Sequence, residues 1–150
     1  MQDFVHLHVH TQYSLLDGQA SVARLVDKAM KNGMKGIAVT DHGNMFGIKE
    51  FTNYVNKKNS GPKGEVKDLK KRIAGIEAGT IECEDKEAEI AACKAKIVEA
   101  ENKLFKPIIG CEMYVARRTM DLKEGKPDQS GYHLIVLAKN ETGYHNLIKL

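Results

Sequence analysis

The sequence of 150 residues lacks several features that would assign a protein to a class at once. It has no run of about 18 or more consecutive apolar residues, so we expect no membrane-spanning helix. Its first residues do not join a basic region to an apolar run, so we expect no secretory signal peptide. Its formal net charge of +3 is too small to argue for nucleic-acid binding by bulk charge.

Cysteine is also scarce. Only Cys83, Cys93 and Cys111 occur, and an odd number at wide spacing fits neither a disulfide framework nor a CxxC metal site. Free thiols are typical of a reducing compartment, so we expect a cytoplasmic protein. The length, with 42% hydrophobic and 29% charged residues, is ordinary for one globular domain.

Both ends of the sequence alternate between strand and helix patterns. Short strands are predicted at residues 4–10, 35–41, 106–116 and 131–140. Helices are predicted at residues 21–32, 46–57 and from near residue 142 onward. Strands that alternate with helices favour a parallel sheet with helices outside it, open or closed into a barrel, so the predicted fold class is α/β.

The stretch between these ends has a different composition. Residues 57–106 hold 22 of the chain's 43 charged residues. After a linker predicted at residues 59–64, two narrow apolar seams predict a helical hairpin. We interpret residues 58–104 as a charged hairpin inserted within a domain whose N-terminal part is residues 1–150. The hairpin is either a solvated excursion packed on itself or a coiled coil for a partner, and both remain open.

Imidazoles and carboxylates recur on the predicted strands and in the loops that follow them: His133 opens the fourth strand, and Glu112 lies within the third. The set comprises His8, His10, Asp17, Asp41, His42, Glu112 and His133. In a parallel barrel, strand ends and the loops after them form the chemical face, so these side chains are expected to approach one another. A mixture of imidazoles and carboxylates without thiolates suits Zn²⁺, Mn²⁺ or Fe²⁺, and two ions about 3.5–4 Å apart can activate a bridging water.

Each of these residues alone has a simpler interpretation. His8 and His10 could be a surface or packing pair, and His133 could be a core histidine. Glu112 lies in an apolar strand, where a buried carboxylate needs a partner; that partner could be a Lys or Arg instead of a metal. Their placement on consecutive strands of one sheet is what favours a metal site.

Two neighbours are expected to support the ligands without binding the metal. His6 shares the strand face of His8 but lies deeper, so we expect it to pack or to orient a ligand. Asp41 alternates away from His42, which favours an orienting role over coordination.

Four segments together resemble a known family, the N-terminal PHP (polymerase and histidinol phosphatase) domains of bacterial DNA polymerase III alpha subunits. They read HLHVHTQYSLLDG, GMKGIAVTDHGNMFG, KPIIGCEMYVA and HLIVLAKNETGYHNLIKL. Stand-alone histidinol phosphatases share the HxH and TDH elements but not the LLDG, GNMFG or GYHNLIKL continuations. The resemblance covers residues 4–57 and 104–150.

The resemblance implies a distorted β/α barrel, seven-stranded when complete, with two or three divalent metals at its C-terminal face. It implies as ligands His8, His10, Asp17, His42, Glu112 and His133, with Asp17 and His42 also supporting a metal-activated water. Three further ligands of the family come from later strands. We therefore expect the sequence to be a truncated domain with an incomplete cluster, inactive alone.

The resemblance leaves three functions open. The first is a metal-dependent phosphoesterase that acts as a 3′→5′ exonuclease on the primer end, for proofreading. The second is a structural module that stabilises the polymerase and docks a separate proofreading exonuclease. The third, a small-molecule phosphatase of the histidinol-phosphate type, is disfavoured by the continuations. The expected partners are primer–template DNA and the remaining polymerase domains, with no membrane.

Overall fold

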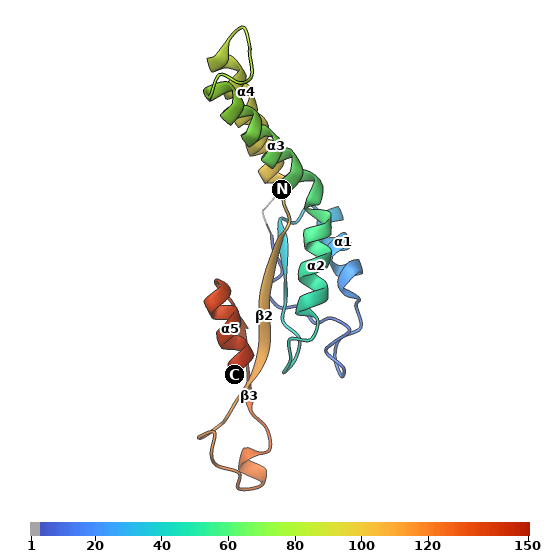
Figure 1. Ribbon diagram of the computed structural model, residues 1–150. Coiled ribbons are helices and arrows are strands. Elements are labelled where there is room, and N and C mark those ends of the chain that lie inside the picture. Colours follow the sequence, from blue (N-terminus) through green and yellow to red (C-terminus); the bar gives the residue numbers. More distant parts are fainter. Residues whose placement is uncertain (1–3) are drawn as a thin grey trace. The chain divides into compact units, whose positions relative to one another are not determined.

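A computed structural model describes residues 4–150 of the chain (Figure 1). Its elements in order are α1 (Val22–Lys31), β1 (Gly36–Val39), α2 (Ile48–Lys58), α3 (Ser60–Glu77), α4 (Lys86–Asn102), β2 (Lys106–Val115), the 3-10 turn η1 (Lys126–Asp128), β3 (Tyr132–Leu137) and α5 (Glu141–Lys149). They form two compact units: a sheet unit, up to Tyr54 and from Lys106 onward, and a hairpin unit, Val55–Phe105. Among the described residues, no helix is long and apolar enough to cross a membrane.

The sheet unit contains one three-stranded sheet in the order β1-β2-β3. β1 pairs with β2 in parallel, and β2 pairs with β3 antiparallel. The α/β class is confirmed, whereas the expectation of an all-parallel sheet is wrong for β3. A parallel connection needs a long crossover, usually a helix, and residues 116–131 hold only a loop with η1. The barrel and its seven strands remain a prediction.

Helices flank this sheet. The apolar stripe of α1 packs on β1 and α5 packs on β2, on opposite sides in Figure 1. α1 ends as its sequence predicts: Gly33 has φ +77°, and the N–H of Met34 donates to the carbonyl of Ala29 at 3.0 Å. This is the hydrogen bond of a Schellman motif, which a residue with positive φ allows.

Residues 4–10 run beside β1 but do not form the regular strand that their alternation predicts. Ala38 and Thr40 donate their N–H groups to the carbonyls of His6 and Val9, both at 2.9 Å. The two donors, Ala38 and Thr40, are two positions apart, whereas the two acceptors, His6 and Val9, are three positions apart. The segment of residues 4–10 therefore carries one extra residue, which interrupts the ladder of hydrogen bonds with β1. The N–H of Val9 donates instead to Oγ1 of Thr40 at 3.0 Å.

The second predicted helix starts later than expected. α2 begins at Ile48, and Phe46, the first residue of the predicted helix, is 73% exposed instead of buried in the helix. Oδ1 of Asn44 accepts a hydrogen bond from the N–H of Phe46 at 3.1 Å, which holds this stretch as a turn. Phe51 and Val55 are buried, as the helical periodicity predicts.

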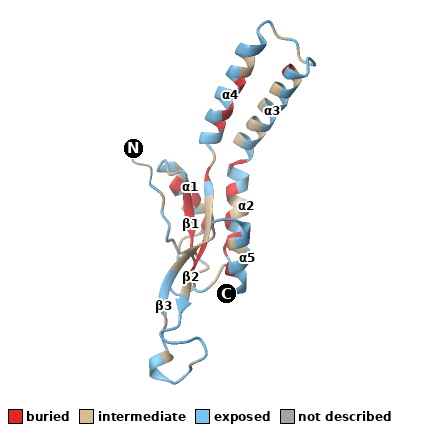
Figure 2. Ribbon diagram, turned by 90° about the vertical axis from the view of Figure 1, so that its left-hand side faces the viewer, coloured by how far each residue is buried: buried red, intermediate tan, exposed pale blue. Residues whose placement is uncertain are grey.

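The hairpin unit consists mainly of α3 and α4, which lie side by side and antiparallel (Figure 1). Figure 2 shows buried positions of α4 on the side that faces α3. The linker predicted at residues 59–64 is wrong, because α3 begins at Ser60. Pro62 lies in the first turn, where a missing N–H costs no intrahelical hydrogen bond. Whether these helices are an insertion relative to other family members remains a prediction.

Asn59→Ala should destabilise the hairpin unit by about 2 kcal/mol, because it leaves two buried backbone groups without partners. The Asn59 side chain donates to the carbonyl of Phe105 at 2.8 Å and accepts from its N–H at 2.9 Å. Hydrogen exchange at the Phe105 amide and urea unfolding measure the loss. Ser60→Ala, which removes only an exposed hydrogen bond to Lys57, is the control. Equal effects of both variants would contradict this account.

Candidate metal centre

Four segments bring the predicted site residues to one end of the sheet. His8 and His10 come from the extended segment beside β1, and His42 lies three residues after the end of β1, bridged in parallel to Glu112 of β2. The antiparallel direction of β3 decides the position of His133, because its register partner is Tyr114 near the end of β2. In an all-parallel sheet His133, at the start of its strand, would lie at the opposite end of the sheet from Glu112.

Glu112 lies at the middle of this cluster. Its Oε2 is 2.9 Å from Nε2 of His8 and 2.6 Å from Nε2 of His10, and its Oε1 is 2.7 Å from Nδ1 of His133. The residue is 5% exposed, and within the described part of the chain its ionic partners are histidines and not Lys or Arg. The simpler interpretation, a salt bridge to a basic side chain, does not apply here.

Glu112 is ionised at neutral pH. Burial alone would raise its pKa, but the hydrogen bonds from His8, His133 and His10 outweigh burial and lower the pKa to about 2. A buried carboxylate that stays charged and faces three imidazoles has the charge and the chemistry of a metal ligand.

The donor atoms form two groups that share Glu112. One group is His8, His10 and Glu112, and the other is His42, Glu112 and His133; within each, the possible ligand atoms lie within 4.8 Å of one another. The Nε2 atoms of His8 and His10 are 3.1 Å apart. Two ligands on one tetrahedral zinc, each bonded at about 2.0 Å, would be about 3.3 Å apart. Glu112 belongs to both groups, and its two oxygens face different histidines, so it would serve as a ligand in each group.

The surroundings of His42 show whether these residues suit a divalent metal. Its Nδ1 lies 2.8 Å from Oδ2 of Asp17, which places the ring proton on Nδ1 and leaves a lone pair on Nε2. That Nε2 is buried and has no hydrogen-bond partner among the described residues. Buried polar atoms rarely stay unpaired, and a histidine held by a carboxylate on one nitrogen commonly binds metal with the other. The residues therefore fit a divalent metal.

Asp17 takes a different position from the other predicted ligands. Its Oδ1 is 3.1 Å from Nδ1 of His10 while its Oδ2 contacts His42, and it belongs to neither donor group. The hydrogen bond from His42 lowers the pKa of Asp17. In this arrangement Asp17 orients two imidazoles; its assignment as a ligand stays a prediction.

Asp41 is buried and points away from the cluster. It accepts hydrogen bonds from the N–H of Thr11 at 2.6 Å and from the Thr11 hydroxyl at 2.9 Å, and so fixes the backbone that follows His10. The sequence did not single out Thr11 or Ser14, whose Oγ accepts from the N–H of His42 at 2.7 Å. Both are fully buried, but small hydroxyl residues are ordinary in loops, so no pattern marked them.

His6 lies outside the cluster. Its ring is exposed and packs edge-on against Phe4, with centroids 4.7 Å apart. We therefore expect His8→Ala to lower metal affinity at least about 10-fold and His6→Ala to leave it unchanged, since only His8 offers a nitrogen to Glu112. Metal titration followed by calorimetry measures both. Equal losses in the two variants would contradict the geometry.

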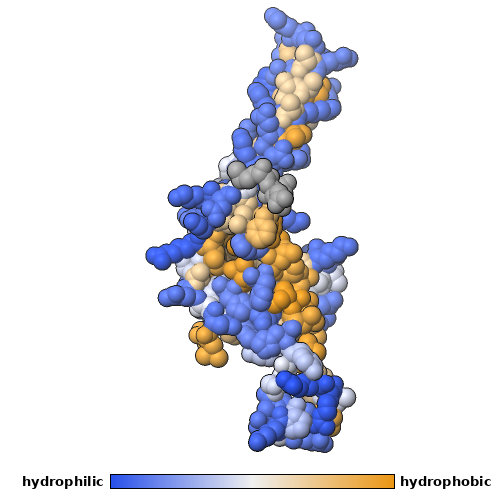
Figure 3. Space-filling model, turned by 180° about the vertical axis from the view of Figure 1, so that it is seen from behind, coloured by the Kyte–Doolittle hydropathy of each residue, from blue (hydrophilic) through white to orange (hydrophobic). Residues whose placement is uncertain are grey.

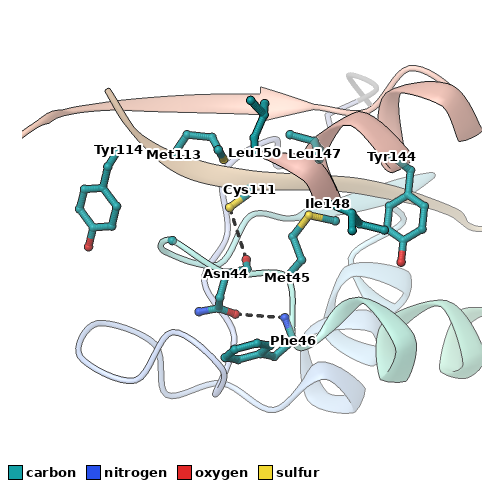
Figure 4. A pocket seen from close by; sticks show the side chains of 11 residues that line it. Asn44, Met45, Phe46, Cys111, Met113, Tyr114, Tyr144, Leu147, Ile148 and Leu150 are labelled. Atoms are coloured by element: carbon teal, nitrogen blue, oxygen red, sulfur yellow. Dashed lines mark hydrogen bonds between the residues drawn. The ribbon is translucent and has the colours of Figure 1, made fainter. Parts of the chain in front are cut away.

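Cys111 is buried and adjoins Glu112 in β2, so their side chains alternate to opposite faces of the strand. It lies on the other face of β2, in a cavity of about 460 Å³ that α5 helps to line. Its thiol donates to the carbonyl of Asn44 at 3.4 Å (Figure 4), and burial raises its pKa. A protonated thiol on that face is not a ligand of this centre.

Comparison with known proteins identifies the family. Residues 6–150 match the family model of the PHP domain. The chain is 40% identical over 148 residues to a protein named DNA polymerase III subunit alpha from Treponema pallidum. It is 41% identical over 150 residues to the protein of the same name from Borreliella burgdorferi. The chain is 32% identical over 155 residues to the protein of that name from Aquifex aeolicus.

These alignments cover 98–99% of this chain but only 9–10% of each relative. The chain thus corresponds to a small part of those proteins. The family model, in contrast, matches nearly every described residue, including all those that converge on Glu112. The resemblance seen in the four sequence segments is confirmed, and the chain belongs to the PHP domain family.

Proposed function

We propose that this chain is part of the PHP domain of a DNA polymerase III alpha subunit, a cytoplasmic replication protein. We propose further that the complete domain is a metal-dependent phosphoesterase with 3′→5′ exonuclease activity on the primer end. The observation that carries this proposal is the convergence of His8, His10 and His133 on the ionised Glu112, beside the unpaired Nε2 of His42.

The residues suggest how the chemistry would be arranged. His8, His10 and Glu112 would hold one divalent ion (Zn²⁺, Mn²⁺ or Fe²⁺), and His42, Glu112 and His133 a second. A third ion would need ligands from elsewhere. A divalent metal bound here lowers the pKa of a coordinated water and offsets phosphate charge.

Asp17 would keep the Nδ1 protons of His10 and His42 in place, so that their other nitrogens present lone pairs. In the overall reaction, the water oxygen bonds to phosphorus and the bond from phosphorus to the 3′ oxygen breaks. That oxygen takes a proton, and a nucleoside 5′-monophosphate leaves the shortened strand.

Metal binding should weaken in acid, because each histidine must lose its proton before it can ligate. We expect affinity to fall at least about 10-fold between pH 7.5 and pH 5.5, with net proton release on binding. Calorimetry in buffers of different ionisation enthalpy measures the protons released. Affinity that is independent of pH, with no proton release, would contradict ligation by these imidazoles.

An observation away from the cluster favours the second function, a structural module. Exposed apolar side chains occur on β3, on α5 and directly after α5: Leu134 is 54% exposed, Ile148 58% and Leu150 83%. Figure 3 shows an apolar area on the side of the molecule where α5 lies. Remaining polymerase domains, or a separate proofreading exonuclease, would bury this area.

His10→Ala in the complete polymerase subunit separates these functions, because His10 contacts both Glu112 and Asp17. We expect loss of metal-dependent release of 3′-terminal nucleotides with polymerase activity retained. Unchanged exonuclease activity would overturn the assignment. Lost polymerase stability without any exonuclease activity in the parent would favour the structural module, and turnover of small phosphomonoesters in place of DNA would favour the phosphatase.

A further inference from the structure

Two leucines beside the metal centre project into solvent. Leu15 is 87% exposed and Leu16 101%. Figure 3 shows an apolar group standing out from polar surroundings over the loop of residues 11–18. This loop borders a cavity of about 300 Å³ lined by Leu15, Leu16, Asp17, His42, Asn44 and Tyr114. The cavity therefore shares two side chains, Asp17 and His42, with the candidate metal centre.

The leucines are held outward by a fixed loop. The N–H of Ser14 donates to the carbonyl of Thr11 at 2.9 Å, and the N–H of Gly18 donates to that of Ser14 at 2.7 Å. A Cβ at Gly18 would lie 1.9 Å from the Thr11 carbonyl oxygen, so this close approach requires glycine. Because the loop is fixed, the exposure of two neighbouring leucines points to a ligand that covers them.

Tyr114 forms an aromatic wall of the cavity. Tyr114 is 62% exposed as a residue, and its ring lies 4.9 Å from the ring of His42, tilted by 31°, and 5.3 Å from that of His133. A Cβ at Gly43 would come within 2.8 Å of the ring, so the ring packs directly over that backbone. The aromatic wall is thus positioned by the same histidines that would bind metal.

Apart from Nε2 of His42, which is left for the metal, the side chains of Asn44 and Asp17 in the cavity are already engaged. The amide nitrogen of Asn44 donates to the carbonyls of Tyr13 and His42, and its oxygen accepts from Phe46. Both carboxylate oxygens of Asp17 face histidines. The cavity therefore offers mainly an aromatic ring and two leucines, and its volume of about 300 Å³ lies at the lower end of the range for ligand pockets, about 300–1,000 Å³.

We propose that this cavity binds the base of the 3′-terminal nucleotide by stacking, without reading its sequence. The proposal rests on the proposed exonuclease function and adds the position of the substrate. An aromatic face and apolar side chains accept any base, because every base has a π-face. A base held here has left the duplex, so an unpaired end is bound in preference to a paired one.

Binding tests this proposal separately from catalysis. In the complete polymerase subunit, single-stranded DNA that ends in 3′-terminal 2-aminopurine should lose fluorescence as its base stacks. The double variant Leu15→Ala/Leu16→Ala should weaken binding at least about 5-fold. Met120→Ala, in an exposed loop with 84% of Met120 accessible, is the control and should bind as the parent does. Unchanged fluorescence on binding, or equal affinities of parent and double variant, would overturn the proposal.

Hydrolysis assays then distinguish failure of the proposed base binding from failure of the proposed exonuclease function. We expect the preference for a normal end over an abasic end to shrink in the double variant, and the four normal bases to differ less than about 3-fold in KM for the parent. A preference larger than about 10-fold for one base would overturn stacking without readout. Failure of the metal-loaded parent to release any nucleotide would instead overturn the exonuclease function, whereas the fluorescence result would still decide whether the base binds.

Discussion

Glu112→Gln is expected to lower the affinity of the domain for divalent metal by more than about 100-fold, beyond the 10–100-fold typical of residues that only orient a ligand. Glu112 is the one residue shared by both donor groups, and its two oxygens face different histidines. Glutamine keeps the shape but removes the charge. We expect metal-dependent phosphoesterase activity of the complete protein to be lost together with metal binding.

Titration calorimetry and elemental analysis measure this effect. Glu141→Gln is a matched control, because the Glu141 side chain is 89% exposed and its ionic partner among the described residues is His145, at 3.8 Å. We expect the control to bind metal as the parent does. Stoichiometric metal in Glu112→Gln, at parental affinity, would show that the centre lies elsewhere.

The lowered pKa of Glu112 also determines how the free energy of unfolding of the metal-free protein should depend on pH. The pKa of Glu112 is lowered to about 2 in the folded protein, from an ordinary value of about 4.3 in an unfolded chain. Its contribution to stability is therefore complete above the unfolded value and is lost as the pH falls toward about 2. Urea unfolding between pH 6 and pH 3 should show this loss in the parent and a smaller one in Glu112→Gln. If the free energies of unfolding of the parent and of Glu112→Gln fell equally with pH, this would contradict the lowered pKa of Glu112.

Asp41→Ala is expected to have the second large effect, a loss of about 3 kcal/mol in the free energy of unfolding. The change leaves the N–H and hydroxyl of Thr11 buried without their charged acceptor. Because Thr11 directly follows His10, metal affinity should also fall, by about 10–100-fold.

Denaturant unfolding and metal titration measure the two losses. Asp121→Ala, at an exposed position, is the control and should stay within about 0.5 kcal/mol of the parent. Thr11→Val removes one of the same hydrogen bonds, so its effect and that of Asp41→Ala should not add. Additive losses, or stability of Asp41→Ala equal to that of the control, would contradict the role assigned to Asp41.

Much of the local structure could be predicted from the sequence. The apolar stripe and terminal glycine of α1, and the strands β1 and β2, follow from short-range patterns. The gathering of His8, His10, His42 and Glu112 follows from one rule, that ligands at the ends of neighbouring parallel strands come together.

The rest depends on tertiary structure. Nothing in the polar loop of residues 116–131 indicates that β3 returns antiparallel, yet that direction is what brings His133 to Glu112. Alternation placed His6 with His8, but one extra residue before Val9 interrupts the ladder and separates them. Gly and Pro at residues 61–62 suggested a linker because composition does not distinguish a loop from the first turn of a helix.

Anomalous scattering from crystals of the complete, metal-loaded protein, with elemental analysis to identify the ions, tests the metal centre most directly. We predict one ion bound by His8, His10 and Glu112, and a second bound by Glu112, His133 and Nε2 of His42. Metal-loaded protein with no anomalous peak at either position, and with these histidines still bonded to Glu112, would contradict a catalytic centre here.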